Sequence, residues 1–263
     1  MNDAESVRDT RGVFEPRVAL ASLSGESDAP WARRGAAHAG AAFLGGIAID
    51  ESTREAAQEM VARDRNEFLP SDPVAFVDDQ FAQLADVPIR PAINVRTTTL
   101  EPLVALADVC REHAAILEIN AHCRQDEICA IGGGESLLTD ADRLCEQVRT
   151  VSREDVSVSV KVRAEVPGVD LPALCSRLER AGAELVHVDA MDSEAVVADI
   201  VQHTGLTVIA NNGVRDRDTV FEYLEYGADA VSVGRPSDDQ RVLARVRDAT
   251  DEWFTQRDRT QKR

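Results

Sequence analysis

The segment Val156-Ser-Val-Ser-Val-Lys161-Val-Arg163 indicates most directly how this chain folds. Its valines occupy every second position and therefore share one face of an extended strand, while Lys161 and Arg163 share the opposite face with the serines. In a barrel of parallel strands the outer face packs under helices, so the valines are expected to point outward. Lys161 and Arg163 then point toward the barrel axis, near the carboxyl end of the strand.

Similar apolar runs alternate with helical segments on both sides of this strand. Repeated β-α units imply parallel strands joined by right-handed crossovers, and eight of them predict a closed (β/α)₈ TIM barrel, which a single domain of 263 residues can supply. An open doubly wound sheet is the alternative, but no G-x-G-x-x-G motif opens a helix after the first strand. The expected strands are Arg17–Ala21, Ala42–Ile47, Ile89–Val95, Ile116–Asn120, Val156–Arg163, Leu185–Asp189, Thr207–Asn211 and Ala230–Gly234, and the expected helices include Leu100–His113, Ala141–Val151, Leu171–Ala181 and Asp216–Tyr226.

The barrel is expected to occupy residues 15–250. Residues 1–14 are expected to form a flexible amino-terminal segment, and residues 251–263 a polar tail that frays. The segment Asn66–Pro88 is longer than an ordinary connection, and its apolar pattern predicts an extra helix packed on the barrel. Asp140 and Asp216 are placed to cap the helices that follow them.

The charge composition is strongly acidic. Asp and Glu total 47 against 29 Lys and Arg, which gives a formal net charge of -18, and the only lysines are Lys161 and Lys262. Such a composition resembles proteins of a high-salt cytoplasm, and it argues against a broad basic surface for RNA. We find no apolar run long enough to span a membrane and no signal peptide, so a cytoplasmic protein is expected. The odd number of cysteines, five, argues against a disulfide framework.

Strand alternation brings nine polar side chains to the carboxyl ends of the strands, where TIM barrels place their active sites. One such inward residue is compatible with a satisfied core group, but nine at the same end of the barrel predict a ligand site. They are Asn94, Arg96, Glu118, Asn120, Lys161, Arg163, His187, Asp189 and Asn211.

The loops after the seventh and eighth strands predict a phosphate site. They read Asn211-Asn-Gly213-Val and Gly234-Arg235-Pro. Glycine lets backbone N–H groups approach phosphate oxygens, and the Arg235 guanidinium can bind two of them. Many barrels bind phosphate with these two loops.

Six stretches between residues 115 and 236 occur in a specific order and spacing. They are Glu118-Ile-Asn-Ala-His-Cys123, Gly134-Glu-Ser-Leu-Leu138, Val160-Lys-Val-Arg163, His187, Ala210-Asn211 and Gly227-Ala-Asp-Ala-Val-Ser-Val-Gly-Arg235. Together they resemble the tRNA-dihydrouridine synthases, a family of FMN-dependent barrel enzymes that use NADPH. The resemblance is weak over the first third of the chain.

The resemblance implies a role for each matching residue. Cys123 would be the acid that protonates uracil C5 as a hydride from the flavin reaches C6. The flavin would be held by Asn94, which stands where the family has glutamine, and by Asn120, Lys161 and His187. A cation such as Lys161 near the ring stabilises the anionic reduced flavin. Its phosphate would be bound by Asn211, Gly213, Gly234 and Arg235, and the substrate would contact Arg163 and Asp189.

The departures from the family pattern concern the substrate. His122 and Arg124 replace the Gly and Pro that flank the family's cysteine, and we expect no C-terminal helical tRNA-binding domain. The leading hypothesis is reduction of uridine in tRNA. One alternative is an FMN-dependent oxidoreductase of a small pyrimidine, similar to dihydroorotate or dihydropyrimidine dehydrogenases. Another is a non-redox barrel in which Lys161 forms a Schiff base with a phosphorylated carbonyl substrate. The last is a barrel, with or without flavin, that has a regulatory or structural role. No metal site is expected, because the His122-Cys123 pair and Cys129 lack a fourth ligand at the usual spacing.

Overall fold

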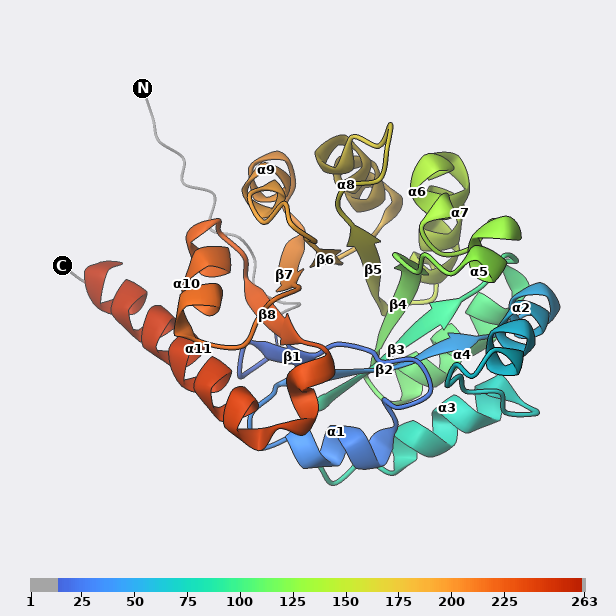
Figure 1. Ribbon diagram of the computed structural model, residues 1–263, viewed down its shortest axis with the longest axis horizontal. Coiled ribbons are helices and arrows are strands. Elements are labelled where there is room, and N and C mark those ends of the chain that lie inside the picture. The colour runs from blue at the N-terminus through green and yellow to red at the C-terminus, as the bar shows by residue number, and fades with distance from the viewer. Residues whose placement is uncertain (1–13, 262–263) are drawn as a thin grey trace.

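A computed structural model describes residues 14–261 and confirms the (β/α)₈ barrel (Figure 1). Eight strands pair in parallel in the order of the sequence, and β8 closes the barrel against β1. The strands are β1 Val18–Leu20, β2 Ala41–Ala48, β3 Arg90–Arg96, β4 Ile116–Ala121, β5 Ser157–Arg163, β6 Leu185–Asp189, β7 Thr207–Asn211 and β8 Ala230–Val233.

Helices surround the strands (Figure 1). Asp140 and Asp216 cap α7 and α10 as predicted, since each side chain accepts a hydrogen bond from the backbone three residues on. The extra helix expected within Asn66–Pro88 is α3. The helices are α1 Ala29–Gly35, α2 Glu51–Ala62, α3 Pro73–Ala82, α4 Glu101–Glu112, α5 Asp126–Ala130, α6 Ser136–Thr139, α7 Ala141–Ser152, α8 Leu171–Ala181, α9 Val196–His203, α10 Arg217–Glu225, the 3₁₀ helix η1 Arg235–Asp238 and α11 Gln240–Gln261.

Two apolar layers hold the barrel together. The larger lies between strands and helices and includes the β5 valines Val158, Val160 and Val162, which confirms that these side chains point outward. The smaller fills the lower part of the barrel interior, with Phe43 and Ile209 among its members. Since the lower interior is apolar, the polar residues on the inward faces gather nearer to the mouth.

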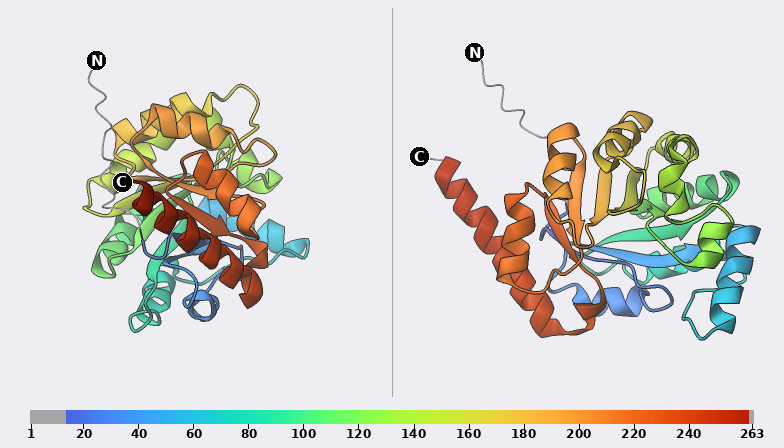
Figure 2. Two further views of the ribbon diagram at one scale, coloured as in Figure 1. Left: turned by 90° about the vertical axis from the view of Figure 1, so that its left-hand side faces the viewer. Right: turned by 45° about the horizontal axis from the view of Figure 1, so that its top comes forward.

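The parts of the chain ends that the structure describes are more ordered than the sequence predicts. Residues 1–13 of the expected flexible segment lie outside the described residues, but Phe14 is 4% exposed and packs into the barrel interior. The tail expected to fray is helical through Gln261, as the continuation of α11. Its aromatic residues explain this, because Trp253 packs edge-on against Phe221 with ring centroids 5.1 Å apart and Arg17 stacks on Phe254. Figure 2 shows α11 lying along α10.

Strand register brings the inward polar residues into adjacent positions. Asn94 pairs with Glu118 across β3 and β4, and Lys161 of β5 pairs with His187 of β6. Because neighbouring parallel strands place paired residues on the same face, these side chains form one polar layer inside the barrel.

Candidate active site at the barrel mouth

A cavity of about 290 Å³ opens at the carboxyl ends of the strands. Each strand contributes to its wall, either through its last residues or through the segment that follows it. Most of the wall is polar or charged. The lining residues are Ser22, Ser24, Gly46, Arg65, Arg96, Asn120, His122, Cys123, Arg124, Gln125, Arg163, Asp189, Met191, Asn212 and Arg235.

The fully buried carboxylate of Glu118 is the centre of a hydrogen-bond network inside the barrel. Its Oε1 accepts a hydrogen bond from Asn94 Nδ2 at 2.8 Å. Its Oε2 accepts one from Ser159 Oγ at 2.9 Å and lies 3.0 Å from His187 Nδ1. A buried carboxylate is costly unless it is paired and hydrogen-bonded, and these three partners meet that need.

His187 connects Glu118 to the β7 and β8 side of the barrel. Its Nε2 lies 2.7 Å from Ser232 Oγ, which also accepts from Asn211 Nδ2 at 2.8 Å. Burial and the charge of Lys161 lower the pKa of His187, although Glu118 opposes the shift, so we assign a neutral ring that donates from Nδ1 to Glu118. Both ring nitrogens are thus used inside the protein, and the flavin contact expected for His187 stays a prediction.

Lys161 is an almost completely buried cation, 2% exposed, in register with Asn120 and His187. Burial lowers its pKa, and the charges of Glu118 and Asp189 oppose that shift. For Glu118, burial raises the pKa, but His187, Lys161 and Asn94 together outweigh burial and hold it below its ordinary value. Within residues 14–261 the Lys161 ammonium has no hydrogen-bond or ion-pair partner, so its donors remain for a bound group.

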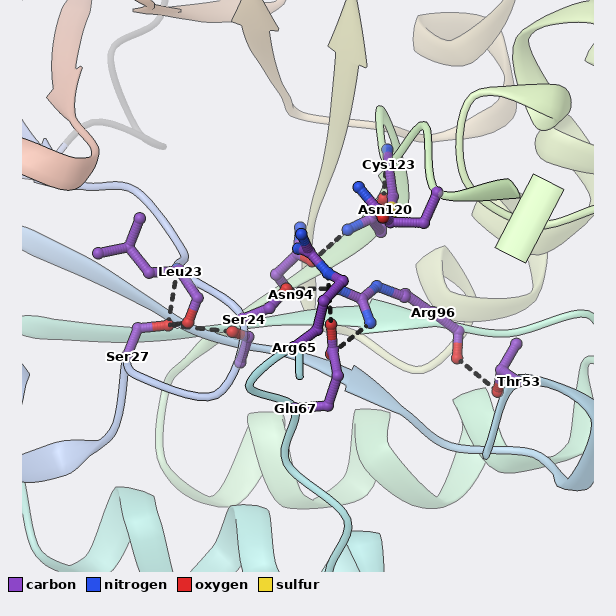
Figure 3. A network of polar contacts seen from close by, with 12 residues as sticks. Leu23, Ser24, Ser27, Thr53, Arg65, Glu67, Asn94, Arg96, Asn120 and Cys123 are labelled. Carbon is purple, nitrogen blue, oxygen red and sulfur yellow. Dashed lines mark hydrogen bonds and ion pairs between the residues drawn. The ribbon is translucent and has the colours of Figure 1, made fainter. Parts of the chain in front are cut away.

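Asn120 joins the buried network to the loop that carries Cys123 (Figure 3). Its Nδ2 donates to Asn94 Oδ1 at 2.7 Å, and its Oδ1 accepts from the backbone N–H of Cys123 at 3.0 Å. Asn120 lines the cavity. Asn94 is fully buried and bonded at both ends of its amide, so the structure gives it a positioning role; the contact with flavin expected for it is a prediction still.

Cys123 lies in the cavity wall, on the loop after β4. Its carbonyl oxygen accepts from Glu135 N at 2.8 Å and from Cys129 Sγ at 3.4 Å. Gly134 packs against the same carbonyl so tightly that a Cβ there would lie 2.1 Å from the oxygen. The turn at Gly134–Glu135 therefore fixes the position of the cysteine loop.

The glycines of the loops after β7 and β8 have open space beside their backbone. A Cβ added at Gly234 would meet no atom within 4 Å, and one at Gly213 would meet only an arginine nitrogen at 3.9 Å. Asn212 adopts a φ of 96°, and its carbonyl accepts from Tyr223 Oη at 2.9 Å, which holds this turn in place. Arg235 and Asn212 line the cavity, as a phosphate site at these loops requires.

Arg163 and Asp189, expected to face the substrate, both line the cavity. They are paired in register at the ends of β5 and β6. Arg163 Nη1 donates to Glu135 Oε2 at 2.7 Å, while its buried Nε has no hydrogen-bond partner among the described residues. The structure therefore brings both residues to one wall, with one guanidinium donor unused.

The family model for dihydrouridine synthases matches residues 90–255, which is more than half of the chain. The chain belongs to the dihydrouridine synthase family. This confirms the resemblance drawn from the motifs between residues 115 and 236.

Two curated proteins are similar to this member of the family. An uncharacterized protein of Methanocaldococcus jannaschii is 25% identical over 235 residues, covering 84% of this chain and 89% of that protein. The catalytic subunit of dihydroorotate dehydrogenase B (NAD(+)) from Halalkalibacterium halodurans is 25% identical over 189 residues, covering 60% of each protein.

Solved structures support the fold of this family member. FabK from Thermotoga maritima, as an M276A mutant, superposes with a TM-score of 0.57 at 14% identity, covering 85% of this chain and 63% of that chain. A chain of the tryptophan synthase complex from Pyrococcus furiosus gives a TM-score of 0.56 at 12% identity, covering 90% of this chain and 97% of that one. At such identities the similarity concerns the barrel alone.

Membership in the dihydrouridine synthase family, with the similarity to a dihydroorotate dehydrogenase, supports an FMN-dependent oxidoreductase. The site fits this cofactor in two respects. Lys161 supplies a buried cation without a partner among residues 14–261, as an electron-rich ring needs. The open backbone at Gly213 and Gly234, beside Arg235, suits a phosphate.

Strand alternation predicts that Glu118 and Arg96 point into the barrel but gives neither a role. Ser232, Arg65 and Glu67 were not predicted from the sequence. Alternation could indicate Ser232, which is one of the inward residues of β8. No local pattern indicates Arg65 or Glu67, because they lie in the irregular segment after α2.

No helix among the described residues is long and apolar enough to cross a membrane. Within residues 14–261, no group of three or more His, Cys, Asp or Glu side chains is arranged to hold a metal ion.

Proposed function

We propose that this protein reduces the C5–C6 double bond of uridine in tRNA, with FMN as its cofactor and NADPH as the electron donor. The observation that carries the proposal is the position of Cys123, a half-buried thiol in the cavity wall whose loop is held on both sides. Reduction of uracil needs a proton donor at C5, and a positioned thiol beside the flavin site meets that requirement.

The residues proposed to hold FMN lie on both sides of the network. Lys161 and Asn120 would contact the ring, while Arg235 and the backbone at Gly213 and Gly234 would bind the phosphate. When bound, FMN would supply the hydride that goes to C6, and NADPH would return the flavin to its reduced form. The role of Lys161 is electrostatic, because its charge stabilises the negative charge of the reduced ring.

Cys123 supplies the proton. As C6 gains the hydride, the S–H bond of Cys123 breaks, its proton bonds to C5, and the thiolate later regains a proton from water. Loss of a general acid usually lowers the rate by about 10²–10⁴-fold. His122 beside the thiol is neutral, because burial and the positive charges of Lys161 and Arg96 hold its pKa well below its ordinary value. A neutral imidazole adds no positive charge that would favour the thiolate.

The experiment has two readouts on FMN-loaded protein with NADPH. Flavin reduction is followed by absorbance, and dihydrouridine in an unmodified tRNA transcript by mass spectrometry. We expect Cys123→Ala to keep flavin reduction and to lose dihydrouridine formation by at least 10²-fold. Cys175→Ala is the matched control, since it removes a buried thiol on α8 that is not among the residues lining the cavity.

The outcomes separate the alternatives. A protein that takes up no FMN refutes the flavin proposal. Flavin reduction without dihydrouridine, in the wild type, refutes the tRNA substrate and moves a small pyrimidine ahead, in line with the similarity to a dihydroorotate dehydrogenase. Full activity of Cys123→Ala keeps the substrate but refutes the proton donor.

A further inference from the structure

Arg96, at the end of β3, is a buried arginine in the wall of the active-site cavity. Its side chain is 2% exposed, and its Nη1 donates to Glu67 Oε2 at 2.7 Å. Its Nη2 donates to Ser24 Oγ, and its buried Nε has no partner among the described residues. Figure 3 shows Arg96 between Glu67 and Asn94, with Arg65 beside Glu67.

The surrounding backbone makes room for this guanidinium. The register of β2 against β3 shifts between Gly45 and Ile47, and the intervening Gly46 has a φ of 36°. A Cβ on Gly46 would lie 2.9 Å from Arg96 Nη2. The bulge and Gly46 thus leave space for the Arg96 guanidinium, which a side chain at position 46 would occupy. Bulges near active sites often direct a side chain in this way.

The charge of Arg96 is only partly matched by protein groups. The side chain of Glu67 is 1% exposed and pairs with Arg96 at 2.7 Å and with Arg65 at 4.0 Å, so one carboxylate serves two guanidinium groups. Burial lowers the pKa of Arg96, but Cys123 and Glu67 outweigh burial and raise the pKa above its ordinary value. Arg96 and Cys123 line the same cavity.

The cavity as a whole has the opposite charge to the rest of the protein. Five arginines line it, whereas Asp189 is the one carboxylate among the lining residues, and the chain carries a net charge of -18. At high salt, exposed charges are screened within a few ångströms, but buried groups are screened much less. Of the five, Arg96 and Arg163 are buried, whereas Arg65, Arg124 and Arg235 are exposed, so the charge that salt screens least is that of Arg96 and Arg163.

We propose that Arg96, with Arg65 and Arg124 on the same wall, binds an oxyanion attached to the pyrimidine that is reduced. The oxyanion is either the phosphate of a uridine nucleotide or a carboxylate on the ring. The site differs from the one proposed for the FMN phosphate, which uses Arg235 after β8. The proposal rests on the proposed function only in placing the pyrimidine beside Cys123.

The test is isothermal titration of the protein with four ligands, in the presence and absence of FMN. Uridine is compared with UMP, and uracil with orotate. A charge-assisted hydrogen-bonded contact corresponds to a gain of about 10- to 100-fold in affinity. We expect UMP to bind at least 10-fold more tightly than uridine if the source is a phosphate, or orotate at least 10-fold more tightly than uracil if it is a carboxylate.

Three variants assign the effect. Arg96→Gln should abolish the preference for the charged ligand, and the double variant Arg96→Gln with Glu67→Gln should do the same without leaving a buried charge unpaired. Arg247→Gln is the control, since this arginine lies on α11 and pairs with Asp251. It should leave the preference unchanged.

A lack of preference in the wild type, or a preference that survives in both Arg96 variants, overturns the inference. Failure of tRNA reduction with a persistent preference for UMP or orotate refutes the proposed function and leaves the oxyanion site standing. Dihydrouridine formation without any preference for UMP or orotate supports the proposed function and refutes the oxyanion site.

Discussion

Replacing Gly134 by alanine tests how firmly the turn before α6 holds the loop of Cys123. Gly134 has a φ of 58°, and a Cβ there would lie 2.1 Å from the Cys123 carbonyl oxygen. Ordinary contact begins near 3.4 Å, so the carbonyl has to move by roughly 1 Å. The left-handed backbone costs about 1–2 kcal/mol for alanine, and loss of the hydrogen bond from Glu135 N costs about 1 kcal/mol more.

A displacement of about 1 Å at a reacting group can lower a rate by about 10²-fold. We therefore expect Gly134→Ala to lose at least that factor in uridine reduction while flavin reduction by NADPH continues. Gly168→Ala is the matched control, because its φ is 79° but a Cβ there would meet no atom within 4 Å. Thermal unfolding and both half-reactions are measured. Equal stability and equal uridine reduction in the two variants would refute the reasoning.

Three further changes test other parts of the site. Lys161→Ala should weaken FMN binding by about 10- to 100-fold in fluorescence titration, because it removes a buried, unpartnered cation; unchanged affinity contradicts the role. Glu118→Gln should lower the free energy of unfolding by about 3–5 kcal/mol, since a buried carboxylate with three partners is lost, and chemical denaturation measures this. Asp50→Asn should cost about 1–3 kcal/mol at neutral pH, because Asp50 caps α2 and binds the Thr97–Thr99 turn. Burial raises the pKa of Asp50, but its hydrogen bonds outweigh burial and lower it, so this stability is present above about pH 4 and is lost as the pH falls through the lowered folded-state pKa. The difference between wild type and Asp50→Asn should therefore shrink in acid melts, and a constant difference down to pH 2 would exclude the assignment.

Much of the fold follows from the period-two pattern of strands such as β5. Alternation correctly sent Val158 and Val160 outward and Lys161 inward, because a parallel barrel strand has helices on one side and the axis on the other. The expected strand Val156–Arg163 differs from β5 by one residue at its start.

The parts that could not be predicted depend on contacts between distant segments. Glu67 reaches Arg96 from an irregular loop 29 residues earlier in the chain, and no periodicity encodes that approach. The tail is ordered because Trp253 and Phe254 pack against other parts of the protein. Two aromatic residues in an otherwise polar sequence do not predict that packing. Asn94 looks like a ligand contact from its inward position alone, and only the geometry shows both ends of its amide already bonded.

Glu118 explains why the two halves of the site are coupled. Through Asn94 and Asn120 it holds the backbone of Cys123, the residue proposed to protonate the substrate. Through His187 it reaches Ser232 and the turn after β7, which concerns the proposed phosphate site. The same carboxylate also supports the charge of Lys161. In a hydrogen-bond network of this kind few donors are unsatisfied, so each side chain in it has little freedom to move independently. Among the described residues that line the mouth, one buried nitrogen in each of Arg96, Arg163 and His122 has no hydrogen-bond partner. Such unsatisfied polar groups are costly in an empty barrel, and a bound anionic cofactor and substrate would offset that cost.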